Sequence, residues 1–81
     1  MIIKMNNKNI FSTTHLHLAV ILSMYYPLEA VDRSNKDKAK FLFRHKNGLD
    51  EIVQSFWKQE LQVEPVAFFQ QIKIVKSRLY E

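Results

Sequence analysis

The sequence predicts a small α+β domain with the order helix, β-hairpin, helix, helix, in which a two-stranded antiparallel sheet packs against the helices. Three observations predict this fold. A nearly all-apolar run ends at Pro27, residues 38–46 alternate between apolar and basic side chains, and two later segments repeat apolar residues at helical spacing. A chain of 81 residues fits one domain. We expect a flexible N-terminal arm over residues 1–9 and a single α+β domain over residues 10–81.

The first helix is expected to begin at Ser12, because a serine is a good N-cap and because Phe11 and Leu16 are spaced for a hydrophobic staple. Nearly every position over residues 18–26 is apolar, so this helix should be buried on most sides. Pro27 ends the helix, since the residue before a proline avoids the helical conformation.

A β-hairpin is predicted next, with strands over residues 28–34 and 38–46 and the turn sequence SNKD between them. Successive side chains of a strand point to opposite faces, so Phe41 and Phe43 face the core while the basic side chains face outward. Gly48 is the only glycine of the chain, and it marks the exit from the hairpin.

Two further helices follow. Residues 49–57 carry an apolar stripe, and Pro65 stands where the first residue of the last helix belongs. The last helix should bury residues spaced by four, three and four, which are Phe68, Ile72, Val75 and Leu79, and it leaves Ile74 on its polar side. Aromatic residues at helical spacing in a small domain are usually core residues. We therefore favour packing over a ligand cage or a base-stacking platform for Phe56, Trp57, Phe68 and Phe69.

Composition argues against catalysis. One glycine is too few for a phosphate-binding loop or a dinucleotide-binding fingerprint, and without cysteine there is no thiol nucleophile and no thiolate metal site. The serines and histidines show no spacing that implies a catalytic triad. His15 and His17, two residues apart on a helix, would point in nearly opposite directions and could not share a metal ion. We expect no enzymatic activity, no cofactor and no metal.

Membrane association is not expected either. The apolar run over residues 16–26 is shorter than the roughly 20 residues that a membrane-spanning helix needs. Cleavage of the chain as a secretory signal after Ala30 would place Leu28 at a position that requires a small residue. The absence of cysteine is compatible with the cytosol, and we expect a cytoplasmic protein.

The basic charge is concentrated in the hairpin. Residues 33–46 hold six of the twelve lysines and arginines and only one acid, Asp37. Cations about 6.5–7 Å apart along a strand face can follow a phosphate backbone. The leading hypothesis is therefore a non-enzymatic module that contacts nucleic-acid phosphates through Lys36, Lys38, Lys40, Arg44 and Lys46. The simplest alternative is that these lysines protect an exposed sheet edge from aggregation.

A second hypothesis is a protein–protein interaction module, an adaptor or an inhibitor encoded by a mobile element, whose partner is a host or phage protein. Adjacent Tyr25 and Tyr26 cannot both face the core, and Ile74 lies on a polar helix face, so these three residues are the candidate interface. A homodimer belongs under this heading, because small domains often gain core by pairing.

The stretches FSTTHLHLAVIL, PLEAVDRSN and FWKQELQVEPVAFFQQIKIVKSRLY together resemble a family of small bacterial and phage proteins that is described only as a domain of unknown function. The most specific matches are Phe56-Trp57, Leu61-x-Val63-x-Pro65, Phe68-Phe69, Lys73, Lys76 and Tyr80. The chain departs from that family in having Glu64 rather than aspartate before the proline. The resemblance implies a bacterial or mobile-element origin and a compact α+β domain, and it implies no activity and no catalytic residues.

Overall fold

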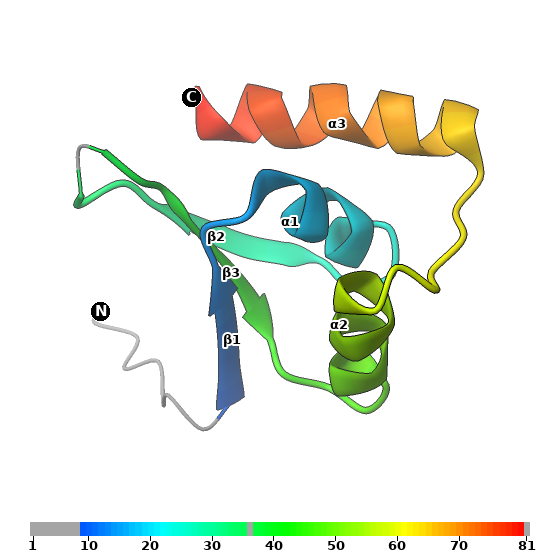
Figure 1. Ribbon diagram of the computed structural model, residues 1–81. Helices are drawn as coiled ribbons and strands as arrows, with labels where there is room; N and C mark the ends of the chain where they lie inside the picture. The colour runs from blue at the N-terminus through cyan, green and yellow to red at the C-terminus, as the bar shows by residue number, and fades with distance from the viewer. Residues whose placement is uncertain (1–8, 36, 81) are drawn as a thin grey trace.

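The computed structural model describes residues 9–35 and 37–80. The described chain forms three helices and three strands, which follow one another in the order β-α-β-β-α-α (Figure 1). The elements are β1 (Ile10–Thr13), α1 (Leu16–Ser23), β2 (Leu28–Asp32), β3 (Lys40–Arg44), α2 (Leu49–Trp57) and α3 (Pro65–Leu79). The predicted α+β class and the predicted order of the last five elements are confirmed. The predicted arm, apart from Asn9, lies outside the described residues.

The sheet has three antiparallel strands in the order β1-β3-β2, not the two that the sequence predicted. The additional strand is β1, which pairs Phe11 with Phe43 and Thr13 with Phe41. The hairpin strands β2 and β3 pair as expected, with an irregularity between Leu28 and Ala30. Because β3 pairs with a strand on each side, it is the centre of the sheet.

The predicted start of the first helix at Ser12 is wrong. Ser12 belongs to β1, and the helix begins at Leu16 with His15 as its N-cap. The imidazole Nδ1 of His15 accepts a hydrogen bond from the backbone N–H of Leu18 at 3.3 Å, and this replaces the serine oxygen that we expected. Serine and threonine are acceptable in a strand as well as at a cap, so pairing with β3 decides their conformation.

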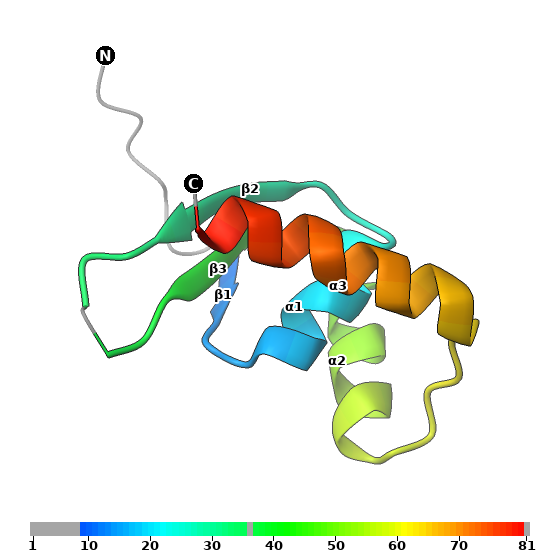
Figure 2. The same ribbon diagram turned by 90° about the horizontal axis from the view of Figure 1, so that it is seen from above.

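All three helices lie on one side of the sheet, and α3 crosses over α1 (Figures 1 and 2). The buried core joins the sheet to the helices, and α1 lies at its centre with five consecutive buried residues. The core residues are Leu18, Ala19, Val20, Leu22, Phe41, Phe43, Leu49 and Val75. Within the described chain, no helix is long and apolar enough to cross a membrane.

Helices α2 and α3 begin where the sequence predicted. Gly48 precedes α2 with φ of 89°, a conformation that favours glycine, and a Cβ there would lie 3.1 Å from the hydroxyl oxygen of Tyr26. Pro65 is the first residue of α3. The carboxylate of Glu64 caps α3, since it accepts hydrogen bonds from the backbone N–H groups of Val66 and Ala67, both at 2.9 Å.

Side chains hold α3 against the rest of the fold. Arg78 Nη1 donates to the Leu28 carbonyl oxygen at 2.9 Å, and Arg33 Nη1 donates to the Leu79 carbonyl oxygen at 2.8 Å. The second contact places a cation at the C-terminal end of a helix, where it interacts favourably with the helix dipole. One of the six cations of the basic stretch therefore has a structural contact.

Backbone strain after α2 gives a first testable prediction. Gln59 has φ of 61°, the only positive φ at a non-glycine residue in the described chain, and a side chain in that region costs about 1–2 kcal/mol. We expect Gln59→Gly to raise the free energy of unfolding by about 0.5–1 kcal/mol, measured by urea denaturation. Gln62→Gly is the matched control, and it should not stabilise the domain. An unchanged or lower stability for Gln59→Gly would contradict this interpretation.

Candidate nucleic-acid interface

The predicted basic strand, β3, is the central strand of the sheet. This position tests the alternative explanation that its lysines protect an exposed sheet edge. Exposed lysines protect a sheet against aggregation when they lie on an edge strand. The edges here are β1 and β2, so Lys40 and Arg44 on β3 do not protect an edge. The edge explanation of these two cations is therefore wrong.

The face of the sheet that points away from the helices carries Lys40 and Arg44. Directly opposed residues of neighbouring antiparallel strands share a face. The strand register therefore groups these two cations with the side chains opposite them and with Leu42 between them. We call this surface the outer sheet face, and it consists of Ile10, Ser12, Ala30, Asp32, Lys40, Leu42 and Arg44. Phe41 and Phe43 point the other way and are 2% and 0% exposed, as predicted.

Carboxylates offset part of this positive charge. Asp32 lies opposite Lys40 in the strand register. Arg44 Nη2 lies 4.0 Å from Glu29 Oε1, a weak exposed pair. The outer sheet face is therefore less basic than the sequence of β3 alone suggests.

Asp32 is held in its charged form. The backbone N–H of Ser34 donates to Asp32 Oδ1 at 2.9 Å. This hydrogen bond, then one from the Ser34 side chain and the nearby charge of Lys40 lower the pKa of Asp32 below its ordinary value, because all three favour the carboxylate. At neutral pH the strand face therefore carries one negative charge beside Lys40.

Two more predicted cations flank β3. Lys38 and Lys46 are both exposed, and no carboxylate among the described residues forms an ion pair with either. Lys38 also lines two open hollows between the hairpin and the end of α3. One of about 240 Å³ includes Thr14 and Leu16, and one of about 530 Å³ includes Tyr80. The fifth predicted cation, Lys36, lies outside the described residues.

The three residues of the alternative interface have different surroundings. Tyr25 and Ile74 are 53% and 55% exposed. Tyr26 is half-buried, packs against the core, and donates its hydroxyl hydrogen to the Asn47 carbonyl oxygen at 3.0 Å. Tyr26 therefore has a structural contact, while Tyr25 and Ile74 are open to solvent.

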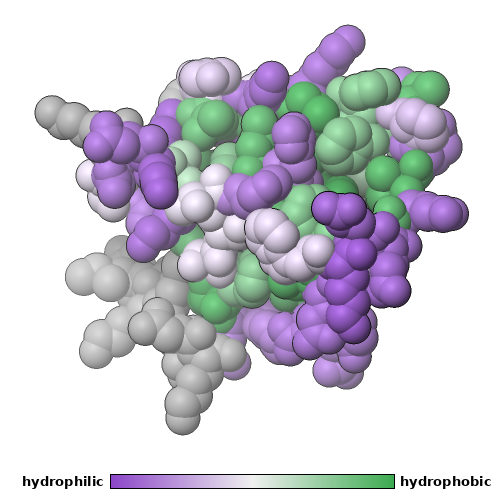
Figure 3. Space-filling model, viewed as in Figure 1, coloured by the Kyte–Doolittle hydropathy of each residue, from purple (hydrophilic) through white to green (hydrophobic). Residues whose placement is uncertain are grey.

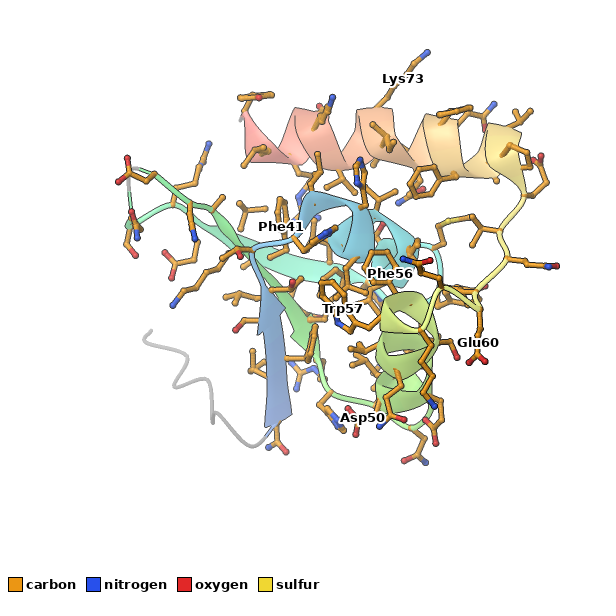
Figure 4. All side chains as sticks on the ribbon, in the orientation of Figure 1. Phe41, Asp50, Phe56, Trp57, Glu60 and Lys73 are labelled. Atoms are coloured by element: carbon orange, nitrogen blue, oxygen red, sulfur yellow. The ribbon has the colours of Figure 1, made fainter. Side chains whose placement is uncertain are left out.

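Trp57 and Phe69, which we expected in the core, are 58% and 63% exposed. Both belong to a chain of touching rings that links the end of α2, the start of α1 and the first half of α3. We call it the aromatic band, and it consists of Trp57, Phe56, His15, His17, Phe68 and Phe69. Figure 4 shows Phe56 and Trp57 beside each other at the end of α2 nearest to α1. In the same orientation, Figure 3 shows hydrophobic and hydrophilic residues intermixed over this side of the molecule.

The sequence contained a signal for this exposure. Adjacent residues on a helix point about 100° apart, so on a helix with a single apolar stripe, such as α2 or α3, a Phe-Trp or Phe-Phe pair does not place both rings in the core.

His15 and His17 lie closer together than we expected, with 5.9 Å between their ring centres. The argument that they point in opposite directions required both to be helical, and His15 is instead the extended N-cap residue. Over residues 9–35 and 37–80, no group of three histidine or carboxylate side chains is placed to hold a metal ion.

Comparison with known proteins identifies the family. No curated protein and no solved structure matches the chain. A family model described as a domain of unknown function, DUF5659, matches residues 8–81. That range includes every described element, and it contains the stretches on which the sequence resemblance rests. The chain belongs to this family, DUF5659.

Proposed function

We propose that this protein is a non-enzymatic module that binds nucleic-acid phosphates through Lys38, Lys40, Arg44 and Lys46, with Lys36 as a fifth cation. The observation that carries the proposal is the location of β3. Its cations lie on the central strand, on the face that no helix of the described chain covers, so neither edge protection nor core packing accounts for them. Exposed cations on a strand face are spaced to contact successive phosphates.

The carboxylates of Glu29 and Asp32, which lie beside Arg44 and opposite Lys40, allow a direct test of whether the outer sheet face binds nucleic acid. Replacing Glu29 and Asp32 by their amides, Glu29→Gln/Asp32→Asn, removes two negative charges with little change in shape. The asparagine still offers an oxygen to the Ser34 N–H. We expect this variant to bind a short DNA duplex about three- to ten-fold more tightly, with a steeper dependence of affinity on salt. Fluorescence anisotropy of a labelled duplex over a range of salt concentrations measures both quantities.

A matched control separates the face from the overall charge. Glu51→Gln/Glu60→Gln removes the same two charges from exposed residues at α2 and the turn after it. This control should change the duplex affinity by less than about two-fold, because Glu51 and Glu60 do not belong to the outer sheet face. Equal tightening by both variants would show that only net charge matters and would reject the face as the binding surface.

The second candidate function is protein–protein interaction, and the exposure of Tyr25 and Ile74 favours it. A pull-down from bacterial lysate, repeated after nuclease treatment, distinguishes the two functions. Phosphate binding predicts that the captured material is lost with nuclease. A protein partner that remains after nuclease, and that Tyr25→Ser/Ile74→Ser abolishes, supports the second candidate instead.

A further inference from the structure

The aromatic band is a continuous surface, not a set of isolated exposed rings. Its ring centres are separated by 5.0 Å from Trp57 to Phe56, 5.3 Å from Phe56 to His15 and 5.9 Å from His15 to His17. From His17 to Phe68 and from Phe68 to Phe69 the separation is 6.2 Å. Trp57, whose ring centre also lies 5.2 Å from that of His15, and Phe69 are the exposed apolar rings toward the two ends of the band.

The band is polar at its centre. Both imidazoles are exposed, and His15 has one nitrogen, Nδ1, occupied as the acceptor of the Leu18 N–H. In the neutral ring, the proton must then be on Nε2, which leaves a hydrogen-bond donor on the band surface. An apolar protein surface would leave that donor without a partner, which is costly, whereas nucleic acid offers phosphate and base oxygens and nitrogens as acceptors.

The band also extends toward Lys38, one of the cations proposed to bind phosphate. His15 follows Thr14, and Thr14 lines the same hollow as Lys38. At the other end of the band, Lys73 lies one helical turn beyond Phe69 and points away from the body of the molecule (Figure 4). Lys73 is therefore a cation at this end of the band, while the capping carboxylate of Glu64 lies one turn before Phe68.

We infer that the aromatic band stacks the unpaired bases of single-stranded nucleic acid, while the phosphates of that strand run toward Lys38. This inference rests on the proposed function and narrows its substrate from nucleic acid in general to the single-stranded form. Exposed aromatic rings beside cations are the combination that single-strand-binding proteins use, because every base has a flat face that stacks on a ring. Bases paired within a duplex do not present those faces.

Trp57 reports the contact directly, because it is the only tryptophan of the chain. The probes are an oligo(dT) of about 12 nucleotides, within the usual footprint of such sites, and a duplex of the same length. Stacking should quench the tryptophan fluorescence with oligo(dT) and not with the duplex. Trp57→Ala should weaken oligo(dT) binding by about 5- to 100-fold and leave duplex binding unchanged.

Two further variants keep the test decisive. Trp57→Phe keeps a ring at this position and should retain most of the affinity for oligo(dT), which rules out a general folding defect as the cause of the loss. Phe69→Ala, at the other end of the band, should also weaken oligo(dT) binding selectively.

The outcomes separate the two proposals. If the duplex and oligo(dT) bind equally without quenching, the stacking inference is wrong and the phosphate-binding function stands. If neither binds, both are wrong. If Trp57→Ala changes only the capture of a protein that survives nuclease treatment, the band is a protein contact and the inference is likewise overturned.

Discussion

Phe43→Ala is expected to cost about 3–5 kcal/mol of unfolding free energy, enough to remove most of the stability of a domain of this size. Phe43 is fully buried on the central strand, opposite Phe11 of β1 and Leu28 of β2, and it belongs to the core cluster with α1. Alanine would leave a cavity where the sheet meets that core. The protein contains no cysteine, so no disulfide can compensate for this loss. Residues 9–35 and 37–80 contain no group of side chains placed to hold a metal ion.

Urea denaturation measures this loss. Leu42→Ala is the matched control, because Leu42 is the neighbouring residue on the opposite, half-exposed face of the same strand, and it should cost less than about 1.5 kcal/mol. If Phe43→Ala does not fold, Phe43→Leu, which removes less volume, should still lower the urea midpoint measurably. A loss below about 1 kcal/mol for Phe43→Ala would contradict the central position that the structure gives to this side chain.

Charge reversal at two of the proposed contact residues, Lys38→Glu/Lys46→Glu, should weaken duplex binding by roughly 10- to 100-fold at low salt; neither lysine forms an ion pair with a carboxylate of the described residues. Each substitution removes a phosphate contact worth about 1 kcal/mol and adds repulsion. The log–log dependence of affinity on salt should flatten by about 2 units, since each neutralised phosphate contributes about 0.9. These two positions are preferable to Lys40 and Arg44, because glutamate at either of those would also repel the facing Asp32 or Glu29 within the fold.

The matched control is Lys73→Glu/Lys76→Glu, which makes the same change in net charge on the exposed side of α3. It should leave the salt dependence of duplex binding nearly unchanged. Anisotropy titrations at several salt concentrations compare the two variants. An equal loss of affinity in both variants would mean that binding depends on the total charge of the protein and that the hairpin is not the binding site.

Short-range patterns predicted the parts of the fold that depend on neighbouring residues. The alternation around Phe41 and Phe43 placed these rings in the core, and Pro65 marked the start of α3. The strand β1 could not be found this way. It has four residues, and its conformation depends on pairing with β3, which lies about thirty residues further along the chain.

The candidate site was predicted only in part for the same reason. The sequence identified the cations of β3, but the strand register brought Asp32 opposite Lys40 and placed Glu29 beside Arg44. Arg33 counted toward the basic stretch, yet it bonds the end of α3, far along the chain. The exposure of Trp57 and Phe69 was not predicted, because the spacing of apolar residues along a helix does not show which side of that helix another element covers.

The most direct test of the central claim is a nuclear magnetic resonance titration, in which a short DNA duplex is added to the isotopically labelled protein. We predict that the backbone amide shifts change most over residues 38–46 and at Ile10 and Ser12, which share the outer sheet face. Shifts confined to α3, around Lys73 and Lys76, with β3 unaffected, would contradict the account. The absence of any shift at duplex concentrations near 1 mM and low salt would contradict it equally, because non-specific phosphate binding is typically tighter than that.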